Sequence, residues 1–189
     1  MPHKPMLTVY SLSHAAVDFA CAFLVFRTML SAPELGLCLL IYNFCAFALQ
    51  MPFGLLADGW NRNAVTAAVG CLLAAAAYLP ALPALAAAVI AGVGNGLFHV
   101  GGGLDVLNDS RERSAALGIF VSPGALGLYL GQILGQGGTL TAVLPVILLL
   151  AAGAAAFWWW SVGGDVTALP EPLRTLWAEH QPRPGATFV

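Results

Sequence analysis

Six long apolar runs divide this chain, and each has the length that a helix needs to cross a lipid bilayer. The hydrocarbon core of a bilayer is about 30 Å thick, so a spanning helix needs about 20 mostly apolar residues. The runs cover residues 7–30, 35–57, 63–80, 84–106, 114–136 and 139–160. They are continuous and rich in Ala, Leu and Gly, whereas a membrane barrel has short alternating segments. The sequence therefore predicts an all-α integral membrane protein with six transmembrane helices.

The composition supports this class and excludes several others. Hydrophobic residues make up 59% of the chain and charged residues 8%, against the roughly 25% of charged residues in a soluble domain. A net charge of −2 leaves no basic patch for nucleic acid. No P-loop, zinc-protease helix or nucleophile elbow is present, so we expect neither an enzyme nor a bound cofactor or metal.

The few cationic residues predict how the chain is oriented. Loops on the cytoplasmic side of a membrane carry an excess of Lys and Arg. Six cations fall before the first run, in the even-numbered connections or after the last run: Lys4, Arg62, Arg111, Arg113, Arg174 and Arg183. We therefore expect a multi-pass protein of the cell inner membrane with both termini in the cytoplasm. Residues 1–161 form the transmembrane domain in this interpretation, and residues 162–189 form a cytoplasmic tail.

Five polar residues interrupt the apolar runs and are the candidate solute-binding residues. They are His14, Asp18, Asn43, Asn95 and His99. Ionisable and amide groups are costly in hydrocarbon, so they usually mark a water-filled path or a bound solute. Residues four apart share one face of a helix, which pairs His14 with Asp18 and Asn95 with His99.

These two pairs are predicted to face one another. His14 and His99 each lie about seven residues from the cytoplasmic end of their run, which is roughly 10 Å deep at about 1.5 Å per residue. Asp18 and Asn95 lie one turn further in. Asp18 can gain or lose a proton and histidine titrates near neutral pH, so Asp18, His14 and His99 are also the candidate proton-coupling residues.

The segment from Gly54 to Asn63 resembles the loop signature between the second and third spans of major facilitator superfamily transporters. Gly54, Asp58 and Arg62 match that pattern, whereas Gly59, Asn61 and Asn63 depart from it. In that family the loop forms a charge relay that latches one conformation. The resemblance implies the same role for Gly54, Asp58 and Arg62.

Further segments are similar to the same family. The Gly-rich stretch from Gly92 to Gly96 resembles its fourth span, although Ala88 stands where an arginine is usual. The stretch from Gly118 to Gly127 resembles the Gly-Pro signature of the antiporter branch, and His14 with Asp18 resembles the His-x-x-x-Asp of fosmidomycin-resistance-type exporters.

The resemblance implies an architecture and a function. Members of this family have two six-span halves, each built from 3+3 inverted repeats, and their solute site lies between the halves. This chain resembles one half, and a homodimer is the simplest way to cover its polar face. We expect a secondary transporter that moves a small polar or charged solute by alternating access and can couple this movement to protons.

Two alternatives remain open at this point. One is a metal-binding membrane enzyme with His14, Asp18, His99 and Asp105 as ligands. The other is a non-transporting subunit of a larger membrane assembly.

Overall fold

The described part of the protein is helical. The computed structural model describes residues 4–60, 62–110 and 114–161, and every regular element within them is a helix. In chain order these are α1 (Lys4–Leu24), η1 (Val25–Met29), α2 (Leu35–Asn43), η2 (Phe44–Ala48), α3 (Gln50–Trp60), α4 (Asn63–Ala76), α5 (Ala84–Asp109), α6 (Ser114–Gly137) and α7 (Val143–Ser161). The segments η1 and η2 are π-helical turns.

Five apolar helical segments are long enough to cross a membrane. They are Pro5–Met29, Leu35–Gly59, Ala84–Asp109, Ser114–Gly137 and Val143–Ser161. A sixth, Asn63–Ala76, is apolar but shorter. The predicted all-α class is thus confirmed, and the helices are compatible with a multi-pass membrane protein. The predicted tail, residues 162–189, lies outside the described residues, as do Arg111, Arg113, Arg174 and Arg183.

The third predicted span is shorter than expected. Its helix, α4, ends at Ala76 rather than at residue 80, and its 14 residues extend only about 21 Å at about 1.5 Å per residue. Two prolines follow, Pro80 and Pro83, and the residue before a proline is biased away from helical geometry. Ala81 between them has a positive φ of 65°. The chain therefore leaves the helix early and turns toward α5.

The second predicted span is interrupted rather than continuous. A π-helical turn, η2, separates α2 from α3, and the amide of Leu49 donates to the carbonyl of Phe44, five residues back. Pro52 explains the break, because a proline within a helix cannot donate to the carbonyl four residues before it and its ring collides with that carbonyl. The affected carbonyl is that of Ala48. The helix widens at this point, as proline-associated kinks do.

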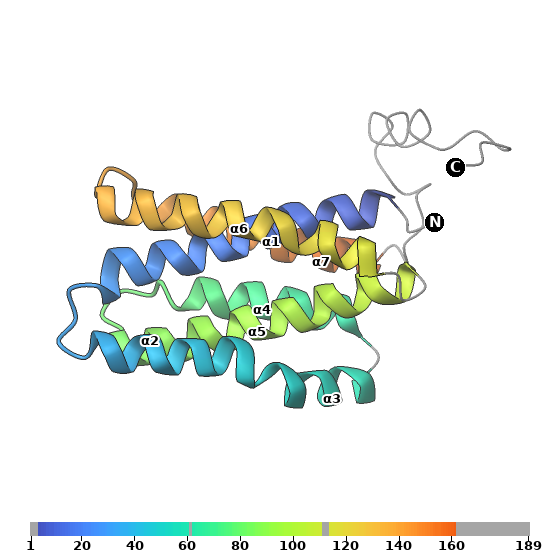
Figure 1. The fold of residues 1–189 in the computed structure, drawn as a ribbon, viewed down its shortest axis with the longest axis horizontal. Coiled ribbons are helices and arrows are strands. Elements are labelled where there is room, and N and C mark those ends of the chain that lie inside the picture. Colours follow the sequence, from blue (N-terminus) through green and yellow to red (C-terminus); the bar gives the residue numbers. More distant parts are fainter. Residues whose placement is uncertain (1–3, 61, 111–113, 162–189) are drawn as a thin grey trace, which may run out of the picture.

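The helices lie in two groups side by side (Figure 1). In one group α1 packs against α6 and α7, and in the other α5 packs against α2, α3 and α4. The two groups meet where α1 contacts α5 and where α4 contacts α7. The start of α1 and the ends of α3 and α5 lie at the same end of the bundle (Figure 1). That end corresponds to the predicted cytoplasmic side.

Glycines allow the closest helix contacts. A Cβ on Gly127 or Gly131 of α6 would collide with the backbone carbonyls of Ala15 or Phe19 on α1. Small residues let helix backbones approach in this way, which is the usual means of packing helices within lipid. The bundle is therefore held by backbone proximity along α1 and α6 as well as by apolar side chains.

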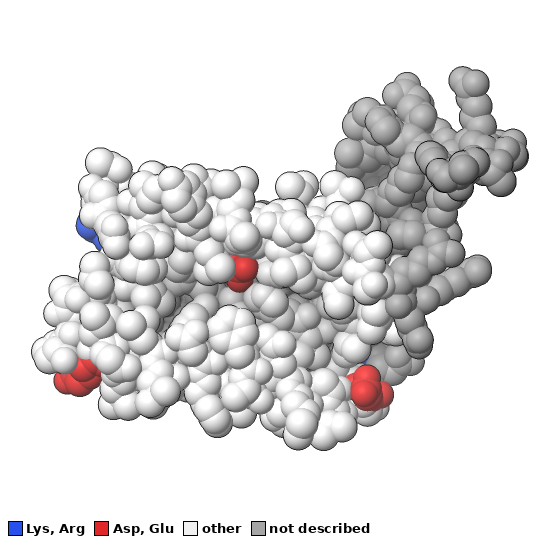
Figure 2. All heavy atoms as spheres, in the orientation of Figure 1, with Lys and Arg blue, Asp and Glu red and all other residues white. Residues whose placement is uncertain are grey.

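Most of the face seen in Figure 2 carries no charged side chain. Large exposed apolar side chains occur on several helices, including Leu40, Met51, Leu55 and Leu126. Acidic atoms show near the middle of this face, between the two groups of helices (Figure 2). A surface of this kind suits contact with lipid or with another membrane protein rather than with water.

Candidate functional site

Four of the predicted polar residues form one cluster between α1 and α5. His14 Nε2 lies 3.1 Å from Asp18 Oδ2, and His99 Nε2 lies 3.7 Å from Asp18 Oδ1. The Asn95 amide donates to Asp18 Oδ1 at 3.2 Å. The two imidazole rings lie 4.4 Å apart between centroids and are almost perpendicular. Asp18 is thus the centre of the cluster and contacts its three other members.

The cluster lies deeper in the bundle than the sequence predicted. His14 is ten residues after the start of α1 at Lys4, and His99 is ten residues before the end of α5 at Asp109. This places both roughly 15 Å from the helix ends at about 1.5 Å per residue. The difference arises because both helices extend three residues beyond the predicted runs. The equal depth of the two histidines was predicted and agrees with their ring contact.

The backbone of α6 orients His14. Its Nδ1 lies 3.0 Å from the carbonyl oxygen of Phe120. Pro123 lies within α6 and has no amide hydrogen to donate to the carbonyl of Ile119, so that carbonyl is free to accept from Ser11 of α1 at 3.3 Å. Two successive carbonyls of α6 thus anchor α1, and Pro123 explains why the first of them, that of Ile119, is free.

The same kind of anchor orients His99. Its Nδ1 lies 2.9 Å from the carbonyl oxygen of Asn95 on the preceding turn of α5. A carbonyl oxygen only accepts hydrogen bonds, so both Nδ1 atoms carry the hydrogen and both Nε2 atoms face Asp18.

This arrangement has a consequence for the charge of the cluster. In a neutral ring Nε2 is an acceptor, as is the Asp18 carboxylate, so the 3.1 Å contact needs a proton or another cation between His14 and Asp18. The contact is therefore satisfied when either His14 or Asp18 carries one further proton.

The backbone of α6 at Gly124 lies directly against Asp18 and His14. A Cβ at this position would lie 2.5 Å from Asp18 Oδ2 and 2.7 Å from His14 Nε2. Any side chain here would displace the two groups. Gly124 was not among the predicted site residues, although it lies within the Gly-Pro stretch that the sequence analysis identified.

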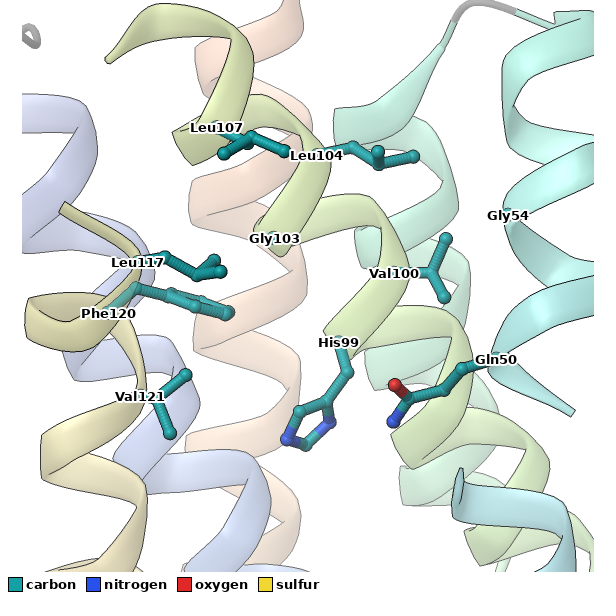
Figure 3. A pocket seen from close by; sticks show the side chains of 10 residues that line it. All are labelled: Gln50, Gly54, His99, Val100, Gly103, Leu104, Leu107, Leu117, Phe120 and Val121. Carbon is teal, nitrogen blue, oxygen red and sulfur yellow. The ribbon is translucent and has the colours of Figure 1, made fainter. Parts of the chain in front are cut away.

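A cavity of about 370 Å³ leads from His99 toward the predicted cytoplasmic end. Figure 3 shows the His99 imidazole projecting between α6 on one side and Gln50 of α3 on the other. The remaining lining is mostly apolar, including Leu104, Leu107 and Phe120. The side chain of His99 is 17% exposed and that of His14 is 2% exposed. His99 is thus the member that connects the cluster to the cavity.

Asn43 is not part of the cluster. It lies at the end of α2 with an exposed side chain, and its amide donates to the carbonyl of Leu39 on its own helix at 2.7 Å. Gln50, which the predicted site did not include, takes a position in the cavity wall.

The residues of the predicted latch occupy the end of α3 and the start of α4. Gly54 lines the cavity, and Asp58 is exposed. The guanidinium carbon of Arg62 lies 5.7 Å from the ring centroid of Trp160 on α7, which is a cation–π distance. Within the described residues no ion pair joins Asp58 to Arg62.

Asp105 is separate from the cluster. Its Oδ2 accepts a hydrogen bond of 2.6 Å from the Tyr10 hydroxyl, so this carboxylate links α5 to α1 near the predicted cytoplasmic end. The described residues that could jointly hold a metal ion are His14, Asp18 and His99, whose ligand atoms all lie within 4.8 Å of one another. Asp105, the fourth ligand in the alternative of a metal-binding enzyme, lies outside this group.

Comparisons with known proteins add no family to this description. No family model, curated protein or solved structure matched the chain.

Proposed function

We propose that this protein is a secondary transporter that moves a small polar or charged solute across the cell inner membrane by alternating access. The observation that carries the proposal is the His14–Asp18–His99 cluster at mid-depth in two apolar helices, with a cavity leading to it from one end of the bundle. Ionisable groups at such depth are tolerated where they face water, a solute or one another. A cavity lined by His99, beside the other two groups, supports a solute path.

The relation between the helix groups supports the expected architecture of a transporter half. The six apolar segments form two triplets in chain order, the first to the third and the fourth to the sixth. The first segment, α1, packs against the other two helices of the second triplet, α6 and α7. The fourth segment, α5, packs in the same way against the second and third segments of the first triplet. Triplets related in this way are the pattern of inverted repeats in transporters. In the family that the sequence resembles, the first and fourth spans line the central cavity, and here α1 and α5 carry the cluster.

A second six-helix unit would complete the site. Asp18 retains 10% side-chain exposure although it lies in the middle of its helix. A charged group at the lipid face is costly, and a facing bundle removes that cost. An identical chain related by a two-fold axis is the simplest such partner.

The same cluster supports the proposed proton coupling. Three titratable groups contact one another, and the geometry between His14 and Asp18 requires a proton or another cation. The groups that face Asp18 from α1 and α5 are His14, His99 and the neutral Asn95. A solute that replaced this proton would be exchanged for it.

Solute flux in proteoliposomes tests the proposal. The purified chain would be reconstituted and supplied with labelled amino acids, organic acids, sugars, organic cations and divalent metal ions, with and without a pH gradient. We expect one class to cross faster than in protein-free liposomes and to accumulate when a gradient is imposed. Glu34→Gln, which alters an exposed carboxylate outside the cluster, is the matched control for Asp18→Asn. A folded protein that moves none of these solutes would contradict the proposal and favour a non-transporting subunit.

A further inference from the structure

The cluster has the dimensions of a metal site. A metal ion with bonds of 2.0–2.2 Å to nitrogen and oxygen holds neighbouring ligand atoms about 3 to 3.5 Å apart. The contact between His14 Nε2 and Asp18 Oδ2 is 3.1 Å, and that between His99 Nε2 and Asp18 Oδ1 is 3.7 Å. One ligand atom from each of the three groups lies within 4.8 Å of the others, so binding of one ion would draw them together by up to about 1 Å.

The ring orientations suit a metal rather than only a proton. Each Nδ1 is held by a backbone carbonyl, of Phe120 for His14 and of Asn95 for His99. Metal-ligating histidines almost always have this second hydrogen bond, because it fixes the tautomer and aims the other nitrogen at the ion. Here two independent carbonyls, on different helices, direct two Nε2 lone pairs toward the same carboxylate.

A buried oxygen beside the cluster lacks a partner. Asn95 is 2% exposed, and its Oδ1 accepts no hydrogen bond among the described residues, although its amide nitrogen donates to Asp18. Buried polar atoms are nearly always satisfied, so an orphan indicates a missing donor. A water bound to an ion at the cluster would be such a donor. The orphan oxygen thus marks room for a polar ligand beside the cluster, and a water on a bound ion would fill that role.

The ligand set selects the class of ion. Two imidazole nitrogens and one carboxylate suit Zn²⁺, Co²⁺ and related transition-metal ions, whereas Ca²⁺ and Mg²⁺ prefer oxygen ligands. Three protein ligands leave a coordination position open, unlike the four of a structural zinc site. An ion held in this way can exchange.

The cavity favours a small ion over a larger organic solute. Its lining offers few hydrogen-bonding side chains besides Gln50 and His99. A sugar or amino acid in it would leave most of its polar groups unpaired, at a cost for each. A volume of about 370 Å³ nevertheless holds a hydrated ion, because a water molecule occupies about 30 Å³. Among the described residues that line the cavity, His99 is the one whose side chain readily ligates a metal ion.

From these observations we infer that His14, Asp18 and His99 bind one divalent transition-metal ion of the zinc class, and that this ion is the transported solute. The inference rests on the transport function proposed above and names its substrate class.

Binding of Co²⁺ and Zn²⁺ to the purified full chain tests the site. The protein would be freed of metal with a chelator in mild detergent and titrated with Co²⁺, whose visible absorption reports nitrogen and oxygen ligands. We expect one Co²⁺ per chain, displacement by Zn²⁺, and no displacement by an equal concentration of Mg²⁺ or Ca²⁺. His99→Ala and Asp18→Asn should each weaken binding by more than about tenfold. Glu34→Gln should not, and the thermal unfolding midpoint shows whether each variant is folded.

Two results would overturn the site. One is a folded wild-type protein that binds no stoichiometric Co²⁺. The other is binding that survives in folded His99→Ala and Asp18→Asn with unchanged affinity, which would place the metal elsewhere.

Flux of Zn²⁺ into proteoliposomes loaded with a zinc-sensitive dye tests the metal as the carried solute. Entry that depends on His99 supports the inference. Stoichiometric metal binding together with flux of another solute, and none of Zn²⁺ or Co²⁺, would overturn the metal as substrate and leave the transport function intact. Metal binding with no flux of any solute would overturn the transport function as well.

Discussion

The Nδ1 atom of His14 on α1 lies 3.0 Å from the carbonyl oxygen of Phe120 on α6. This contact fixes the face that His14 presents to Asp18, and it depends on the helix that follows the α5–α6 connection. The neighbouring carbonyl, of Ile119, is free because Pro123 cannot donate to it. The orientation of the central histidine is therefore encoded more than a hundred residues later in the chain.

Gly124→Ala should damage the cluster without dismantling the bundle. The added methyl group would lie 2.5 Å from Asp18 Oδ2 and 2.7 Å from His14 Nε2, so both groups would have to move. Overpacking of this kind costs about 1–3 kcal/mol. We expect transport and metal binding to fall at least tenfold, measured by flux and by Co²⁺ titration. Gly118→Ala on the same helix is the control, because nothing lies within 4 Å of a Cβ there. Wild-type activity in Gly124→Ala would mean that the cluster is not the site.

Gly127→Ala should lower the stability of the bundle. Its Cβ would collide with the carbonyl of Ala15, and a backbone atom cannot turn aside as a side chain can. We expect a loss of about 1–3 kcal/mol, measured as a lower unfolding midpoint in a denaturing-detergent titration. Gly118→Ala again serves as the control. Equal midpoints for the two variants would show that α1 and α6 are not held by close backbone contact.

The meeting of His14, Asp18, Asn95 and His99 could be predicted from the sequence. The spacing of four residues places the two members of each pair on one face of their helix. Counting residues from the helix ends places the two pairs at the same depth. Both arguments indicate the same four residues. Neither depends on knowing the tertiary fold in detail. Asn43 had only its residue type in its favour, and an amide near a helix end can bond to its own backbone, as Asn43 does to Leu39.

The remaining parts of the site were not predicted, for physical reasons that differ. The anchor for His14 is a backbone carbonyl, which no residue type identifies, although Pro123 within an apolar run was a signal that carbonyls would be free. Gly124 became significant only when α6 was placed against α1. The break in the second span had a usable signal in Pro52, whose effect on the carbonyl of Ala48 follows from local geometry alone.

Cysteine labelling tests the predicted topology. The four native cysteines are buried, so an introduced cysteine should react against a low background. Glu34→Cys, on the loop before α2, should be labelled by an impermeant reagent from outside intact cells, since the cation distribution places that loop outside. Gly59→Cys, near the end of α3, should be labelled only after the membrane is opened; both positions are exposed. External labelling of Gly59→Cys would reverse or refute the topology.

The proposed homodimer should be visible in its mass and its cross-links. In mild detergent or nanodiscs we expect twice the chain mass of 19.6 kDa, measured by light scattering with the detergent subtracted. Leu12 is 66% exposed on α1, near the cluster, and Leu72 is 54% exposed on α4, which packs behind α5 (Figure 1). Leu12→Cys should form a disulfide between copies on oxidation, whereas Leu72→Cys should not. A monodisperse monomer that transports at the full rate would contradict the dimer.

Asp18→Asn should uncouple transport from the proton gradient. The substituted side chain has nearly the same volume, and its oxygen can still accept the hydrogen bond from Asn95. It lacks the negative charge that holds a cation between His14 and the carboxylate. We expect the variant to lose accumulation of solute against its concentration gradient. Flux of solute down its own gradient, at a saturating concentration, should fall less, because that movement needs no coupled proton. Because the substitution removes one titratable group from the cluster, we expect the variant's flux to vary less with pH than wild-type flux. Both are measured in proteoliposomes by imposing a pH gradient and then by changing pH equally on the two sides, with Glu34→Gln as the control. Full gradient-driven accumulation by Asp18→Asn would show that coupling does not pass through this carboxylate.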